Sequence, residues 1–234
     1  MSRNNEPSFP QGLRAAVPVL IGYIPAGTAF GLLAESSHML LTDTLGFSVV
    51  VFAGASQFMA IGLIQTGATA MQIILATFLL NFRHFLMSAS LADKIRKGHP
   101  ALKAVLGFLV TDETFAVASA EQREIGPGYF AGLGLAAWLA WITGTTGGFL
   151  LGSFIPSRLR DALAVALYAL FAGLLVPLLK KRLANIFLAI LAGLVHMLLI
   201  FSGLAPGWAF VVAIVIPALF GAIVVRNTET PEVE

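Results

Sequence analysis

The polar segment Asn81-Phe82-Arg83-His84 lies inside a long apolar stretch of the sequence. A charged side chain in the middle of a membrane helix costs about 2.5–3.5 kcal/mol on insertion scales, so such residues are functional candidates by default. The donor fork of Arg83 suits a carboxylate, either of a substrate or of the chain itself. His84 can exchange a proton near neutral pH. We predict substrate contacts for Asn81 and Arg83 and proton coupling for His84; alternatively, a shorter helix ends here and Arg83 extends to the membrane surface.

Two adjacent carboxylates, Asp112 and Glu113, lie in a second apolar stretch. Like charges repel each other there, which favours binding of a proton by one of the two. We therefore predict that the pair takes part in proton coupling. The alternatives are a structural ion pair with Arg83 and a simple turn at the membrane surface.

Two glycine-containing segments complete the candidate substrate site. Ser56 and Gln57, within Gly54-Ala55-Ser56-Gln57-Phe58, can hydrogen-bond a ligand, although they can equally join two closely packed helices. Pro25 and Gly27 interrupt the first apolar stretch, and a proline inside a helix removes one backbone donor. We predict a kink or discontinuity near Pro25, where exposed backbone groups would hold the charged ends of a zwitterion; the alternative is a packing kink.

Several other chemistries lack their motifs. The chain has no cysteine, no phosphate-binding GxxxxGK[ST] loop and no HExxH motif, and its four histidines are scattered. We therefore expect no cofactor, no metal site and no enzymatic activity. An intramembrane hydrolase that uses Ser56 and His84 is kept as an alternative.

The composition identifies the elements that must position these residues. Of the 234 residues, 58 % are hydrophobic and only 11 % are charged, whereas soluble domains have about 25 % charged residues. We predict an all-α polytopic membrane protein, with one transmembrane domain over 1–234 and exposed tails at 1–11 and 226–234. About seven transmembrane helices are expected, near 13–34, 46–65, 68–92, 128–154, 161–179, 183–203 and 206–225. The segment 104–120 is short for a crossing of about 20 residues, and it predicts a half-helix, a re-entrant segment or a short eighth span.

A weak internal repeat is present. Phe52-Ala53-Gly54 recurs as Phe171-Ala172-Gly173, 119 residues later, and Phe30 matches Phe149 at the same offset. This pattern suggests an inverted repeat with halves at 12–120 and 128–225, about three spans in each half, and broken helices. Chance matches among common residues are the alternative.

The motifs occur in an order that resembles a known family. Pro18-x-x-x-Gly22-x-x-Pro25-x-Gly27-x-x-Phe30-Gly31, Phe52-Ala53-Gly54-Ala55-Ser56-Gln57-Phe58, Asn81-Phe82-Arg83-His84 and Asp112-Glu113-Thr114-Phe115 follow one another. The chain thus resembles the AzlC family, the large subunits of branched-chain amino acid exporters. The likeness is dense over about 12–118 and thin from 128 onward.

This resemblance implies a multi-pass permease of the bacterial inner membrane. It would export valine, leucine, isoleucine and, in some members, methionine. It would act with a small AzlD-type membrane partner and use the proton motive force. A membrane subunit that assembles or regulates without transporting is the remaining alternative.

Overall fold

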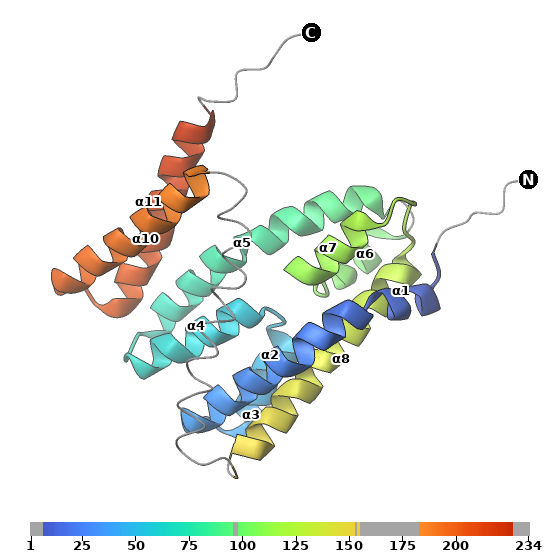
Figure 1. The fold of residues 1–234 in the computed structure, drawn as a ribbon, viewed down its shortest axis with the longest axis horizontal. Helices are drawn as coiled ribbons and strands as arrows, with labels where there is room; N and C mark the ends of the chain where they lie inside the picture. The colour runs from blue at the N-terminus through green and yellow to red at the C-terminus, as the bar shows by residue number, and fades with distance from the viewer. Residues whose placement is uncertain (1–6, 96–97, 153, 155–182, 227–234) are drawn as a thin grey trace, which may run out of the picture. The chain divides into compact units, whose positions relative to one another are not determined.

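The computed structural model describes residues 7–95, 98–152, 154 and 183–226, and these ranges contain helices and connecting turns but no strand (Figure 1). The predicted all-α class is therefore confirmed. The chain divides into two compact units, one of residues 1–58 and 81–164 and the other of residues 59–80 and 165–234. The single transporter domain over 1–234 stays a prediction.

Long apolar helices occupy four of the seven predicted crossings in the part of the chain that the structure describes. Within the described residues, four helices are long and apolar enough to cross a membrane: α2 (Val17–Ser36), α5 (Ala70–Lys94), α8 (Pro127–Gly152) and the Pro206–Ile223 part of α11 (Pro206–Arg226). At 1.5 Å per residue, the 25 residues of α5 extend for about 38 Å, more than the roughly 30 Å of a bilayer core. α10 (Leu183–Phe201) is a further apolar helix. The prediction of a polytopic membrane protein is confirmed, while the span expected at 161–179 lies outside the described residues.

Two of the expected segments are broken into shorter helices. The stretch 46–65 belongs to α3 (Leu41–Val50) and α4 (Gly54–Gln65), which are separated at residues 51–53. The stretch 104–120 belongs to α6 (Pro100–Gly107) and α7 (Asp112–Ala120), which are separated at residues 108–111. With 8 and 9 residues, α6 and α7 are each about 12–14 Å long, so neither can cross a bilayer alone. The half-helix alternative therefore describes 104–120 best.

The predicted discontinuity near Pro25 is wrong, because α2 continues through this residue from Val17 to Ser36. The first apolar stretch is interrupted earlier, between α1 (Phe9–Ala15) and α2. Pro18 lies in the first turn of α2, where a missing backbone N–H has no helical acceptor to lose. Pro18, rather than Pro25, is thus the proline next to a helix boundary.

Helices α2 and α8 pack through glycines along one shared face, and Figure 1 shows them side by side. A Cβ atom added at Gly31 would lie 2.1 Å from the backbone oxygen of Thr145, and one added at Gly148 would lie 2.0 Å from that of Thr28. Small residues permit this approach of two backbones in a membrane bundle. Any larger side chain at these positions would push the helices apart.

The same contacts show that α2 and α8 run in the same direction. Gly27 lies against Trp141 near the middle of the pair, and Glu35 lies against Gly152 at its C-terminal end. The offset of 119 residues relates these two helices, and corresponding helices of an inverted repeat run in opposite directions. Since α2 and α8 are parallel, they do not have the opposite directions that an inverted repeat requires. The second match, at 171–173, lies outside the described residues, and the repeat halves stay a prediction.

In the other unit, α10 and α11 form an antiparallel pair. Gly203, with a φ of 81°, follows α10, and the Leu204 amide donates to the Leu199 carbonyl at 3.1 Å. Only a residue that tolerates positive φ fits this end of a helix. A Cβ added at Gly221 of α11 would lie 2.8 Å from Leu188 of α10, so this contact is close as well.

Candidate functional site

The candidate site is built around the buried side chain of Tyr23, which α2 places in the interior of the first unit. Its ring lies 5.4 Å from the ring of Trp141 and 6.0 Å from that of Phe52, in edge-to-face arrangements. The Trp141 ring also stacks on Phe30 at 6.3 Å. Such aromatic pairs favour a fixed ring geometry, so the neighbouring rings hold the Tyr23 hydroxyl in one position.

The break between α3 and α4 and the break between α6 and α7 meet beside Tyr23. Phe52 from the break between α3 and α4 and Phe108 from the break between α6 and α7 have ring centroids 6.2 Å apart. The Tyr23 hydroxyl lies 2.6 Å from Oγ1 of Thr111, the residue that caps the N-terminus of α7. Tyr23 thus contacts a residue of each break. Broken helices that meet inside a bundle are typical of the binding sites of secondary transporters.

The adjacent carboxylates have different partners. Asp112 Oδ2 accepts from Nη2 of Arg83 at 2.9 Å, whereas Glu113 Oε2 accepts from the Tyr23 hydroxyl at 2.6 Å. Of the alternatives left open for Arg83, the structure contains the ion pair with Asp112. The side chains of this pair are 43 % and 47 % exposed within the isolated chain.

Ser56 and Gln57, near the start of α4, bond to groups of α3, α5 and α8 and to Val51 in the first break. The Ser56 hydroxyl donates to Oδ1 of Asn81 at 2.6 Å. The Gln57 amide donates to the carbonyls of Phe47, at 2.8 Å, and Val51, and its oxygen accepts from Nε1 of Trp141 at 2.9 Å. The same two carbonyls also accept backbone N–H groups, of Val51 and Ala53. Gln57 therefore adds a side-chain link between the start of α4 and the end of α3 and fixes the indole of Trp141.

The structure thus brings all of the predicted site residues into one unit but not into one contact. Ser56 with Asn81, and Arg83 with Asp112, form pairs. Pro25 is exposed, and Gly27 is buried against the backbone of α8. Because α2 is continuous, these two residues do not provide the exposed backbone that was expected of them.

Two residues of the site were not singled out from the sequence. Tyr23 was not among the candidates, and Thr111 was overlooked although it directly precedes Asp112-Glu113. A threonine followed by acidic residues is a signal for a helix N-terminus. The indole N–H of Trp141 belongs to the same part of the unit, where it donates to the Gln57 amide oxygen.

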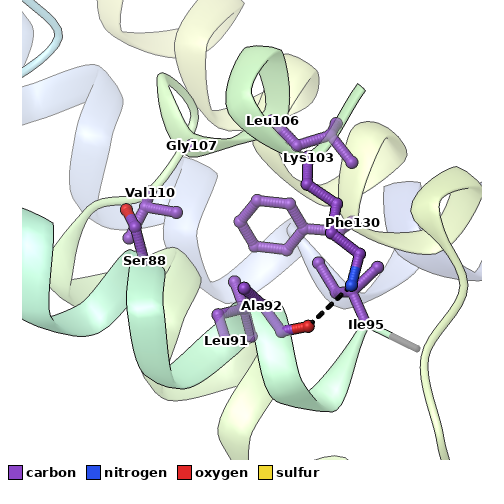
Figure 2. Close-up of a pocket in the computed structure, with 9 residues that line it drawn as sticks. All are labelled: Ser88, Leu91, Ala92, Ile95, Lys103, Leu106, Gly107, Val110 and Phe130. Atoms are coloured by element: carbon purple, nitrogen blue, oxygen red, sulfur yellow. Dashed lines mark hydrogen bonds between the residues drawn. The ribbon is translucent and has the colours of Figure 1, made fainter. Parts of the chain in front are cut away.

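A small cavity lies between α5, α6 and α8 and has a volume of about 20 Å³. Figure 2 shows the Lys103 ammonium beside it, donating to the Ala92 carbonyl at 2.9 Å, with the Phe130 ring at the centre. This volume holds about one water molecule, so the cavity is too small for an amino acid. Among the described residues, no three His, Asp or Glu side chains could hold a metal ion together.

The comparisons with known proteins support a transport role. The chain is 35 % identical over 178 residues to an uncharacterized membrane protein of Archaeoglobus fulgidus, with 74 % of this chain and 77 % of that one covered. It is 29 % identical over 203 residues to the inner membrane protein YgaZ of Escherichia coli, with 83 % of each covered. It is also 25 % identical over 167 residues to the branched-chain amino acid transport protein AzlC of Bacillus subtilis, with 70 % of this chain and 65 % of that one covered. No solved structure matches.

Two of these relatives are named as membrane proteins and the third as a transport protein. Together with the apolar helices, these names support a multi-pass membrane transporter rather than an enzyme. The family model of the AzlC protein matches residues 18–155, more than half of the chain and nearly all of the helices that build the candidate site. The chain belongs to the AzlC family.

Proposed function

We propose that this chain is the large subunit of a secondary transporter that exports branched-chain amino acids across the bacterial inner membrane. Valine, leucine, isoleucine and methionine are the proposed substrates, a small AzlD-type membrane protein is the proposed partner, and the proton motive force is the proposed driving force. The observation that carries this proposal is the meeting of two helix breaks beside a buried tyrosine and an arginine–aspartate pair. The name of the Bacillus subtilis relative supports the substrate class.

The chemistry of the site fits a zwitterion with an apolar side chain. Phe52 and Phe108 offer an apolar surface at the two breaks. We assign the contacts with the charged ends of the substrate to Ser56, Asn81 and Arg83, and to backbone groups at 51–53 and 108–111 in place of Pro25 and Gly27. A pocket of this kind discriminates one methylene by only about 1–3 kcal/mol, which accounts for a range of aliphatic substrates.

Counterflow of labelled valine tests the proposal. Proteoliposomes that contain the chain and its small partner are expected to exchange labelled for unlabelled valine. Arg83→Ala and Asp112→Asn are expected to abolish the exchange, because each change removes one half of the ion pair. Arg123→Ala, which removes another ion-paired arginine from an exposed loop, is the matched control and should leave exchange intact. Normal exchange by correctly inserted Arg83→Ala and Asp112→Asn variants would contradict the assignment.

The alternative of an intramembrane hydrolase predicts a different result, namely product formation in detergent without a sealed bilayer. The geometry favours transport, because the Ser56 hydroxyl donates to the amide oxygen of Asn81 rather than to an imidazole. An assembly subunit, in turn, predicts no counterflow even when the partner is present.

A further inference from the structure

The hydroxyl of Tyr23 has two acceptors but only one hydrogen. Its oxygen lies 2.6 Å from Glu113 Oε2 and 2.6 Å from Thr111 Oγ1. Both are short, well-formed contacts, and a phenol donates one hydrogen bond at a time. One of the two neighbouring groups must therefore donate to the tyrosine oxygen.

Two arrangements of hydrogens satisfy every group, and they differ in the charge of Glu113. When Glu113 is ionised, Tyr23 donates to it and Thr111 donates to Tyr23. When Glu113 is protonated, Glu113 donates to Tyr23, Tyr23 donates to Thr111, and Thr111 donates to Thr114 at 3.2 Å. In both arrangements the Thr114 hydroxyl donates to the carbonyl of Leu109 at 2.9 Å. The direction of the hydrogen bonds reverses, but no donor loses its acceptor.

Asp112 cannot change its charge without the loss of an interaction. Its partner is the guanidinium of Arg83 at 2.9 Å, which stays charged at all ordinary pH values. Protonation of Asp112 would leave that cation without its counter-charge. Of the described residues, the other titratable groups near this pair are His84 on α5, which is half-buried, and Tyr23 itself.

We propose that Glu113 rather than Asp112 binds the transported proton, and that Tyr23 transmits the protonation state of Glu113 to the two helix breaks. A proton taken from water on one side converts the Glu113 carboxylate to the acid and is released to water on the other side. The change reaches Thr111 at one break through a hydrogen bond and Phe52 at the other through the ring of Tyr23. Tyr23 is thus a positioning residue, and Asp112 is the fixed counter-ion of Arg83.

Infrared difference spectroscopy of the purified full-length chain tests the assignment without any substrate. Spectra recorded at high and low pH are expected to contain the carbonyl band of a protonated carboxylic acid that Glu113→Gln removes and Asp112→Asn retains. Exposed carboxyl groups titrate equally in all three proteins and cancel in the comparison. Glu113→Asp keeps a carboxyl group and should keep a band, which controls for misfolding. Loss of the band in Asp112→Asn with its retention in Glu113→Gln would overturn the proposal.

A second experiment measures valine transport and rests on the proposed function. It uses proteoliposomes that contain the chain and its small partner. Glu113→Gln is expected to retain valine counterflow but to lose its acceleration by a pH gradient, whereas Asp112→Asn loses both together. Tyr23→Phe keeps the ring contacts and should reduce the gradient-driven component about tenfold, as expected for one lost hydrogen bond to a charged group. Undiminished gradient-driven transport by Glu113→Gln would overturn the inference. Absence of counterflow in the unmodified protein would refute the proposed function instead, and the infrared result would still decide the role of Glu113.

Discussion

Replacing Gly148 by alanine is expected to separate the two parallel helices of the first unit. A Cβ atom at this position would lie 2.0 Å from the backbone oxygen of Thr28 and 2.7 Å from its carbonyl carbon. Contacts of a Cβ below 3.0 Å are essentially absent from real proteins. The backbones of α2 and α8 must therefore move apart locally by at least the difference, 1.0 Å, because neither contacting atom belongs to a flexible side chain.

The size of the effect follows from two opposing contributions. Overpacking a well-packed interior costs about 1–3 kcal/mol, and a backbone contact places this change near the upper end. Alanine is also a better helix former than glycine by about 0.8–1.0 kcal/mol. The net destabilisation should therefore be about 2 kcal/mol, which lowers the midpoint of thermal unfolding by about 4–8 °C for a chain of this length.

The neighbouring residue Gly147 provides the matched control. A Cβ added there meets no described atom within 4 Å beyond the neighbouring residues and backbone of its own helix, so Gly147→Ala should keep or slightly raise the unfolding midpoint. Both variants can be compared in detergent by tryptophan fluorescence, because α8 carries Trp138 and Trp141. Equal midpoints for Gly147→Ala and Gly148→Ala would refute the close approach of α2 and α8.

Three further changes test other parts of the structure. Gln57→Leu leaves the Trp141 indole N–H without its acceptor and removes one of the two donors to the Phe47 and Val51 carbonyls. It should therefore destabilise the protein by about 1–3 kcal/mol in the same unfolding assay. Arg83→Lys keeps the charge but not the planar donor fork, so valine counterflow should fall between that of the unmodified protein and that of Arg83→Ala; full activity would show that charge alone suffices. In the loop after α7, the hydrogen bond from Arg123 lowers the pKa of Glu121 from 4.5 to about 2. This depressed pKa means that the pair stabilises the fold above about pH 4.5 and that the contribution disappears as the pH falls through 2, so Glu121→Gln should cost less than about 1 kcal/mol at pH 7 and nothing below pH 2.

The helical membrane class followed from composition because lipid-facing surfaces require apolar side chains along whole helices. The partner of Arg83 was also among the predicted options, since a charge in an apolar segment needs an opposite charge. Hydropathy could not reveal the break at 51–53, because these residues are as apolar as the helices on either side. The Gln57 side chain donates to two carbonyls across this break, a contact that no sequence average records.

The error at Pro25 and the omission of Tyr23 have related causes. A proline in an apolar helix was interpreted as a break, but membrane helices tolerate proline because neighbouring groups compensate for the lost hydrogen bond. Tyr23 gains its role only when α2, the N-terminus of α7 and the first break come together. Such a contact joins residues about 90 positions apart in sequence, and no local pattern encodes it.

Because α2 and α8 are parallel, their N-terminal ends must lie on one side of the membrane and their C-terminal ends on the other. Two helices that cross in the same direction require an odd number of crossings in the chain between them. Of the described helices between α2 and α8, α5 alone is long enough to supply one. Ser8 and Gly128 must then face one aqueous compartment, and His38 and Phe154 the other. Since the chain contains no cysteine, a single cysteine introduced at each position and labelled from outside intact cells would report which compartment that is.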